Sequence, residues 1–292
     1  MTLVSVIVTT RNEETNIRRC LLSIKRQTHK NIEIIVVDNN STDRTKEIAR
    51  EFTSNVFNLG PERSEQRNFG ISQSQGLVVL YIDADMALSP EVVAQCVAAF
   101  DQDPDVVGLY IPERVVGRGL WIKVRDHERS FYDATPIDAV RAIRRKTFDD
   151  VGGFDVDLTG VEDWDFDIRV KYTGKVSSIK APVFHNENGF NLRTYLKKKT
   201  YYGQSFDTYR RKWGETEPAV SKQFDPFYRY FIVFVENQKY LRLLAHPILT
   251  LGMCCLRVAV GISYVRDRKN RPTPVTSHLD EASNDVKTGQ AS

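Results

Sequence analysis

Residues 77–85, LVVLYIDAD, decide the fold of this chain. The six apolar residues at 77–82 are aliphatic or aromatic and too few for a helix, so they predict a strand buried on both faces. Asp83 and Asp85 leave that strand at its carboxyl end, where open α/β sheets bind ligands. Two such close carboxylates face water or share a cation, and Mg²⁺ or Mn²⁺ holding a diphosphate suits them. For an isolated Asp-x-Asp, a turn that caps the next helix is the more ordinary interpretation.

The order of strand, polar turn and helix recurs on both sides of this stretch. That repetition is typical of βαβ units and of a mostly parallel sheet flanked by helices. Pro90 is expected in the first turn of the helix that follows Asp85. Strands are predicted at 4–8, 32–37, 77–82, 106–111 and 176–179, and helices at 17–24, 45–52 and 91–100.

Composition and charge narrow the class of protein. The chain has 292 residues, of which 41% are hydrophobic and 27% charged, as in one large globular domain with an appendage. A net charge of +3 gives no reason to expect a nucleic-acid partner. The four cysteines lack the spacing of a zinc site and indicate a reduced, cytosolic compartment. The first apolar run, residues 3–8, is too short for a signal sequence, so the catalytic part is expected on the cytoplasmic side.

We expect one catalytic domain at residues 1–225, with a nucleotide-binding half at 1–110 and an acceptor half at 111–225. Basic clusters fall at 144–146, 197–199 and 210–212. They would suit an anionic membrane or a lipid phosphate, although a solvated basic face is the more ordinary explanation.

Residues 226–269 differ in character from the rest of the chain. They hold an aromatic cluster and the nearly continuous apolar run 246–265, interrupted by Arg257. Such a segment is marginal as a membrane span and favours a helix in the membrane interface, with a buried helix packed on the sheet as the alternative. Residues 270–292 lack apolar periodicity and are predicted to be a disordered tail.

Six segments, taken in order, make the chain resemble family 2 glycosyltransferases of the GT-A fold. Each segment is weak evidence alone, but the ordered set covers roughly residues 1–200. The resemblance implies an inverting enzyme that uses Mn²⁺ or Mg²⁺ and moves a sugar from a UDP- or GDP-sugar donor to a glycan or polyprenyl-linked acceptor, in cell-surface polysaccharide or glycolipid synthesis. The segments are residues 4–14, 38–43, 67–70 (RNFG), 83–85, 152–155 (GGFD) and 162–164 (EDW).

The resemblance places the nucleoside at the ends of the first two strands. Asp38 is implied to accept a hydrogen bond from the nucleobase, and Thr10, Arg11 and Glu13 to line the nucleoside pocket. From sequence alone, an Asx turn or helix cap is the better interpretation of Asp38. Family members commonly have Pro-Thr-Tyr where this chain has Thr-Thr-Arg at 9–11, so uridine and guanosine both stay open.

The resemblance also assigns the diphosphate and the metal. Arg67 could approach the nucleotide or its diphosphate, which suits the planar fork of a guanidinium, or could be a solvated cation on a helix. Asp83 and Asp85 match the metal-binding Asp-x-Asp, with Asp85 the more direct ligand. His185 is either a further metal ligand or a histidine that only hydrogen-bonds its loop.

Catalysis is assigned to residues 162–164. Asp163 is implied to be the base that takes the acceptor proton, and Glu162 to orient the acceptor or support Asp163. Crowded carboxylates should raise the pKa of at least one of them, whereas an acidic helix N-terminus would explain the same residues without catalysis. Trp164 and Arg141 are expected to contact substrate in the acceptor half.

Three other interpretations concern parts of the same sequence. The Asp-Ala-Asp-Met segment followed by Pro90 also resembles dolichol-phosphate mannose synthases, which make polyprenyl-phosphate sugars. A nucleotide-sugar-binding protein without transfer activity would keep the donor site and need no base. A nucleotidyltransferase would carry a glycine-rich phosphate loop near the first strand, and residues 9–14 contain no glycine.

Overall fold

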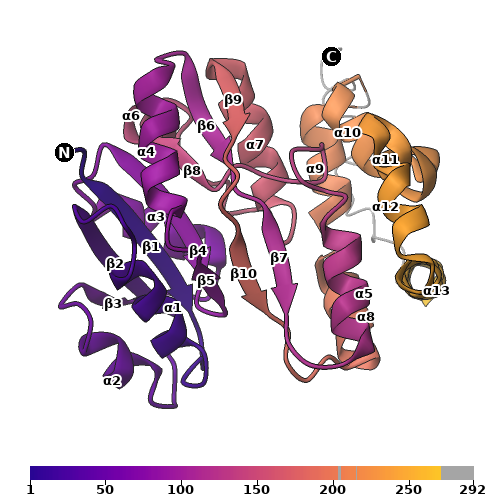
Figure 1. Cartoon of the computed structure of the whole chain (residues 1–292), viewed down its shortest axis with the longest axis horizontal. Helices are drawn as coiled ribbons and strands as arrows, with labels where there is room; N and C mark the ends of the chain where they lie inside the picture. The colour runs from indigo at the N-terminus through magenta and orange to yellow at the C-terminus, as the bar shows by residue number, and fades with distance from the viewer. Residues whose placement is uncertain (203–204, 215, 271–292) are drawn as a thin grey trace, which may run out of the picture.

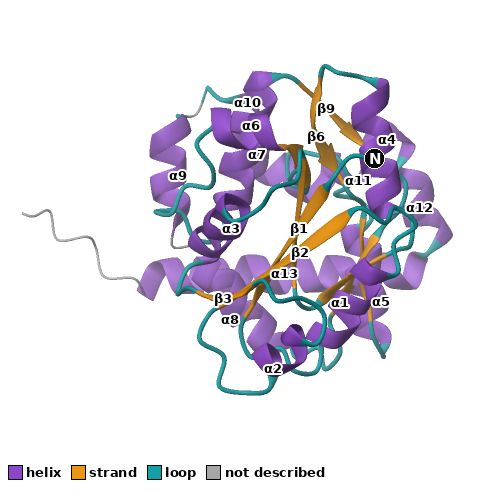
Figure 2. Ribbon diagram, turned by 90° about the vertical axis from the view of Figure 1, so that its left-hand side faces the viewer, coloured by secondary structure: helices purple, strands orange, loops and turns teal. Residues whose placement is uncertain are grey.

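The computed structural model describes residues 1–202, 205–214 and 216–270. Within them, the strands form two sheets, and helices flank both faces of the larger one (Figures 1 and 2). The larger sheet contains β1 (Val4–Thr10), β2 (Ile32–Asp38), β3 (Val56–Asn58), β4 (Val78–Asp83), β6 (Val106–Tyr110), β8 (Ala142–Arg144) and β9 (Lys175–Ser178). The smaller sheet contains β5 (Met86–Leu88), β7 (Glu113–Val116) and β10 (Val183–Asn186).

The larger sheet has the strand order β3-β2-β1-β4-β8-β6-β9. Its neighbouring strands are parallel except at β8, which runs antiparallel to both β4 and β6. In the register, Thr10 pairs with Asp38 and Thr9 pairs with Asp83. Three polar strand ends therefore meet at one edge of the sheet. The predicted mostly parallel α/β fold is confirmed.

Side-chain alternation along the central strands builds two cores, one on each face of the sheet. On β1, Val6 and Val8 pack in the core that includes α1, while Ile7 packs in the core that includes α3 and α7. The helices of the catalytic part are α1 (Ile17–Lys25), α2 (Thr45–Arg50), α3 (Arg63–Ser72), α4 (Val92–Gln102), α5 (Leu120–Arg129), α6 (Arg145–Asp150), α7 (Glu162–Thr173), α8 (Leu192–Tyr202), α9 (Phe206–Trp213) and α10 (Pro218–Phe224).

Small differences from the sequence prediction occur at element ends. Leu77 precedes β4, and its side chain is 70% exposed because it lies at the amino-terminal rim of the sheet. Pro90 lies one residue before Glu91, the N-cap of α4, and not in the first turn of that helix. The helix expected at 45–52 ends at Arg50.

The two expected halves share one sheet. β8 comes from the second half yet inserts between β4 and β6, and β9 adds to the edge at β6. The small sheet likewise joins the halves, since β10 pairs with β5 and with β7. A cavity between the halves is therefore walled by segments that lie far apart in the sequence.

The C-terminal helices pack on α5 rather than on the main sheet. A separate core joins Phe131 to Phe234 and Met253, and Arg257 is buried against Glu128. In the part of the chain that the structure describes, no helix is both long and apolar enough to cross a bilayer. Most of the predicted tail, residues 271–292, lies outside the described residues. The C-terminal helices are η2 (Tyr228–Ile232), α11 (Val233–Val235), η3 (Glu236–Gln238), α12 (Tyr240–Ala245) and α13 (Pro247–Asn270).

Candidate active site

A cavity of about 1470 Å³ opens at the carboxyl ends of β1 and β4. The lining comes from those strand ends and from α3, α5, α7 and α13. Of the predicted site residues, the cavity is lined by Thr10, Arg11, Glu13, Asp83, Asp85, Arg141, Glu162, Asp163, Trp164 and His185. Most of the residues singled out in the sequence therefore lie around one cavity.

Asp38, which the resemblance places against the nucleobase, lies outside this lining. Its carboxylate is fully buried and accepts the backbone N–H and the hydroxyl of Ser41. Such a local bond from the side chain to the backbone three residues on is of the capping type, one of the two interpretations that the sequence alone favours. The next residue, Asn39, lines the cavity, as does Thr10, whose buried Oγ1 has no hydrogen-bond partner. Thr10 and Asn39 are thus better placed than Asp38 to meet a ligand at this end.

Arg67 is also outside the lining, because it is buried behind the site. Its side chain is 1% exposed and lies over the rings of Tyr81 and Phe154. Its Nη1 donates to Oδ1 of Asp163 at 2.6 Å, and its Nη2 lies 3.5 Å from Oδ1 of Asp83. Arg67 therefore joins the Asp-x-Asp turn to the proposed base and is not positioned to touch a diphosphate directly.

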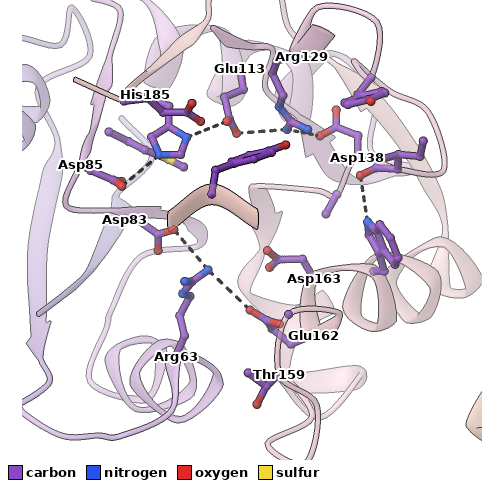
Figure 3. Close-up of a pocket in the computed structure, with 18 of the residues that line it drawn as sticks. Arg63, Asp83, Asp85, Glu113, Arg129, Asp138, Thr159, Glu162, Asp163 and His185 are labelled. Carbon is purple, nitrogen blue, oxygen red and sulfur yellow. Dashed lines mark hydrogen bonds and ion pairs between the residues drawn. The ribbon is translucent and has the colours of Figure 1, made fainter. Parts of the chain in front are cut away.

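Arg63, one helical turn before Arg67, lines the cavity in its place. Figure 3 shows its guanidinium between Asp83 and Glu162, at 3.6 Å and 3.9 Å. Sequence reasoning missed Arg63, although its spacing of four residues from Arg67 puts both on one face of α3. Arg63 is the cation of this helix that could reach a phosphate.

Burial and nearby charges shift the pKa values of Asp83 and Glu162 in opposite directions. Burial alone would raise the pKa of Asp83, but Arg63 and Arg67 outweigh it and hold that pKa well below its usual range. Burial, followed by the charge of Asp163, raises the pKa of Glu162. Asp83 is thus held ionised, whereas Glu162 keeps its proton to a higher pH than an ordinary glutamate does.

The RNFG and GGFD segments hold each other in place. Asn68 donates to the carbonyl of Phe154 and accepts its N–H, both at 2.8 Å. Gly152 and Gly153 adopt φ of +75° and +73°, and a Cβ at Gly153 would lie 2.7 Å from the Asn68 side chain. Glycine is required there, and the two segments act by holding Phe154 against Arg67.

Asp85 lies on another wall of the cavity, beside His185 (Figure 3). The His185 Nε2 is 3.1 Å from Oδ2 of Asp85, and its Nδ1 is 3.0 Å from Oε1 of Glu113. Burial lowers the pKa of His185, but the hydrogen bonds to Asp85 and Glu113 outweigh it and raise the pKa to about 10. Two carboxylates that favour a proton on this ring would equally favour a divalent cation beside it.

The donor set suits a cation that takes its other ligands from a bound diphosphate. Oδ1 of Asp85 is buried and has no hydrogen-bond partner, and Nε2 of His185 faces the same carboxylate. Among the described residues, no group of three or more His, Cys, Asp or Glu side chains could hold a metal. Asp83 instead accepts from Thr9 and pairs with the two arginines. Protein ligation would therefore come from Asp85 and His185, a number that Mg²⁺ or Mn²⁺ accepts when phosphates complete the shell.

The remaining predicted residues are placed as follows. Arg141 is partly buried, with its side chain 12% exposed, and donates to Glu113 at 2.5 Å. Trp164 donates its indole N–H to the carbonyl of Ile137 at 3.0 Å and stacks on Phe206. Sequence reasoning missed Glu113 entirely. The only signal was its position just after the strand at 106–111, at the edge where ligands bind.

The fold and this cavity define the class: a GT-A type sheet with a carboxylate-lined site at the ends of its parallel strands. Residues 5–155, more than half of the chain, match the family model described as Glycosyl transferase family 2. The chain therefore belongs to glycosyl transferase family 2. The predicted family is confirmed.

Curated relatives match mainly over part of their length. Glycosyltransferase AglE of Haloferax volcanii is 43% identical over 91 residues, which cover 28% of this chain and 30% of AglE. The putative glycosyltransferase EpsH of Bacillus subtilis is 34% identical over 110 residues, covering 36% of this chain and 32% of EpsH. A PGL/p-HBAD biosynthesis glycosyltransferase of Mycobacterium bovis is 29% identical over 175 residues, covering 56% of this chain and 68% of that protein. The chain spans about a third of the length of the first two relatives.

Solved structures agree over nearly the whole chain. The mannosyltransferase PcManGT of Pyrobaculum calidifontis, in complex with GDP-Man and Mn²⁺, has a TM-score of 0.60 at 20% identity and covers 91% of this chain and 88% of its own. TarS 1-349 of S. aureus, in complex with UDP, has a TM-score of 0.53 at 20% identity, with 91% and 90% covered. At these identities the likeness shows the fold, and it matches the one predicted.

Proposed function

We propose that the chain is an inverting, metal-dependent glycosyltransferase that moves a sugar from a UDP- or GDP-sugar to a hydroxyl of a glycan or lipid-linked acceptor. One observation carries this proposal. A carboxylate on α7, Asp163, faces the same cavity as the ends of β1 and β4 and is held by an arginine.

The donor would lie against the strand ends. Thr10 and Asn39, with the neighbouring Arg11 and Glu13, would surround the nucleoside, and Arg63 would donate to the diphosphate. The neighbouring structures with GDP-Man and with UDP support either nucleotide, so the base is left to experiment. Arg67 would contribute by fixing the positions of Asp83 and Asp163.

Asp85 and His185 would hold the cation. When bound, Mn²⁺ or Mg²⁺ would offset the negative charge that grows on the departing nucleoside diphosphate. The Mn²⁺ in the mannosyltransferase structure supports this part of the proposal.

Asp163 would act as the base. It takes the proton of the acceptor hydroxyl while that oxygen forms a bond to the anomeric carbon from the face opposite the nucleotide. The bond from the anomeric carbon to the diphosphate oxygen breaks, and its electron pair leaves with the nucleoside diphosphate. One displacement inverts the anomeric centre. Glu162, with its raised pKa, would hydrogen-bond the acceptor or Asp163.

The test is a panel of UDP- and GDP-sugars incubated with purified protein and Mn²⁺, Mg²⁺ or chelator. We expect one donor to be bound and turned over only with metal, and Asp85→Ala to lose both. The absence of nucleotide-sugar binding under every condition would contradict the assigned donor site. Retained function in Asp163→Asn would instead favour a binding protein without catalysis.

We further propose that the chain works at a membrane surface, on an acceptor with a lipid tail. Most of the exposed large apolar side chains in the described part of the chain lie between residues 227 and 265. On α13 they follow helical spacing along one face that no other part of the described chain covers. This face consists of Ile248, Leu251, Cys255, Val258, Ile262 and Val265.

The position of α13 supports a lipid-linked acceptor. Val260, Gly261 and Ser263 of the same helix line the catalytic cavity, so the helix that carries the apolar face also forms part of the cavity wall. Exposed Arg242 and Arg266 near the two ends of this face would suit anionic lipid. The polyprenyl-phosphate sugar synthase alternative shares this surface and differs only in the acceptor atom, a phosphate oxygen.

Vesicle sedimentation tests the surface. We expect the protein to sediment with phosphatidylglycerol vesicles and less with phosphatidylcholine vesicles, and Leu251→Glu to reduce both. Leu77→Glu is the matched control, because Leu77 and Leu251 are similarly exposed, at 70% and 67%, on different parts of the molecule. Equal binding by wild type and Leu251→Glu, or a stable dimer through this face, would contradict the proposal. Mannose- or glucose-type transfer to a polyprenyl phosphate, but not to a hydroxyl, would select the synthase alternative.

A further inference from the structure

Glu113 is a buried carboxylate at the start of β7, and the proposed reaction assigns it no role. It is 6% exposed and accepts hydrogen bonds from three side chains. His185 Nδ1 lies 3.0 Å away, Arg129 Nη2 3.2 Å and Arg141 Nη2 2.5 Å, and Figure 3 shows the first two contacts. Burying a carboxylate is costly unless such partners compensate its charge, and these three donors supply that compensation.

Glu113 reaches the edge of the cavity through the small sheet. β7 runs parallel to β10, which carries His185, and β10 pairs in turn with β5, directly after Asp85. The chain of contacts is Glu113 to Nδ1 of His185, and Nε2 of His185 to Asp85. A histidine that donates Nδ1–H to a carboxylate presents the lone pair of Nε2 on its other side.

We propose that Glu113 is a positioning residue for the divalent cation. It keeps the His185 proton on Nδ1 and fixes the plane of the ring, so that Nε2 faces the cation site beside Asp85. Carboxylate partners of metal-binding histidines commonly act in this way, and their loss lowers metal affinity 10- to 100-fold. This inference rests on the proposed cation at Asp85 and His185 and adds the residue that orients one of its ligands.

A purely structural role would be for Glu113 to neutralise Arg129 and Arg141. Asp138 offers the matched comparison, because it is also buried and accepts from Arg129, at 3.1 Å, but makes no hydrogen bond or ion pair with His185. If arginine pairing alone mattered, Glu113→Gln and Asp138→Asn would affect the site alike. If orientation of His185 matters, only Glu113→Gln lowers cation affinity strongly.

The experiment measures Mn²⁺ affinity of the full chain by calorimetry, for Mn²⁺ alone and in the presence of UDP or GDP. We expect Glu113→Gln to bind Mn²⁺ about 10- to 100-fold more weakly than wild type. Asp138→Asn should stay within about threefold of wild type. The double variant Glu113→Gln/His185→Gln should be no weaker than His185→Gln alone, because both changes remove one ligand arrangement.

Three results would decide against the inference. Wild-type affinity in Glu113→Gln overturns it and leaves the proposed function intact, as does additivity of the two changes in the double variant. Absence of Mn²⁺ binding by wild type even with UDP or GDP present overturns the proposed metal dependence as well. If Glu113→Gln does not fold, ¹⁵N NMR of wild-type His185 with Mg²⁺ and nucleotide decides, since a proton on Nε2 instead of Nδ1 contradicts the proposal.

Discussion

Asp83 and Asp85 are two residues apart, yet they belong to two different walls of the cavity. Asp83 faces the wall of α3 and α7, where Arg63 and Arg67 hold it ionised. Asp85 faces the small sheet, where its Oδ2 meets His185 and its Oδ1 has no hydrogen-bond partner. One short motif therefore provides two chemical settings, because each carboxylate receives partners from different elements. The two carboxylates of an Asp-x-Asp pair can therefore face different partners within one fold.

The largest expected effect on sugar transfer comes from Asp163, on the wall of the cavity that holds Arg63 and Arg67, here called the arginine wall. Asp163→Asn keeps the size of the side chain and removes the base, so transfer should fall about 100- to 10,000-fold. Donor binding should stay near that of wild type, because Asp163 is assigned to the acceptor. Measuring turnover and donor affinity on the same preparation checks both. A variant that transfers sugar at the wild-type rate would remove Asp163 from the mechanism.

Replacing Asp85 and Asp83 by Asn, one at a time, tests whether the two carboxylates have different roles in binding the cation. Asp85→Asn should weaken Mn²⁺ binding by at least about 100-fold, equivalent to about 3 kcal/mol, because a direct ligand is lost. Asp83→Asn should weaken it less than about tenfold, since Asp83 pairs with arginines. Calorimetric titration of both variants measures this difference. Equal losses would show that both carboxylates ligate the cation.

The buried arginine should matter more for stability than for contact with substrate. Arg67→Met leaves Asp83 and Asp163 without a buried cation between them, so the free energy of unfolding should fall by about 3–5 kcal/mol. Urea denaturation measures this change. Arg18→Met is the control, because the Arg18–Glu51 pair is exposed and should contribute far less. Similar losses of unfolding free energy in Arg67→Met and Arg18→Met would contradict the larger contribution expected of the buried arginine.

The smallest expected effect is the pH dependence that Asp83 gives to the free energy of unfolding. The folded-state pKa of Asp83 lies below its unfolded value, so its ion pairs stabilise the fold above the unfolded pKa of about 3.9. This contribution is lost as the pH falls through the lower folded pKa. The difference in unfolding free energy between wild type and Asp83→Asn should be constant from about pH 8 to 5 and shrink below about pH 4. A difference that changes between pH 8 and 5 would assign the effect to another group.

Much of the fold was predictable because it depends on local patterns. The apolar runs of β1, β2 and β4 were identified as parallel strands, and the four apolar positions of α1, Ile17, Cys20, Leu21 and Ile24, are all buried. Consecutive apolar residues and helical spacing report burial without knowledge of distant partners. Strand ends were less certain, as exposed Leu77 shows, because the rim of a sheet has the same composition as its interior.

The candidate site was predictable where position along a strand suffices. Thr10, Asp83 and Asp85 were placed at the ligand-binding edge because parallel strands end there together. Asp38 ends a strand at that edge too, but Ser41 takes its carboxylate. Arg67 was expected on the nucleotide, yet it contacts Asp163, 96 residues later in the chain.

The sequence by itself determined the family, the parallel sheet and the edge at which chemistry would occur, since these follow from periodicity and from an ordered set of motifs. Only the tertiary structure decided which side chains enter the cavity and with what charge. Arg63 replaces Arg67 there, and Glu113 lies behind His185. The physical reason is that the pKa and orientation of a buried group depend on the partners that compensate its charge, and folding brings those partners from distant segments.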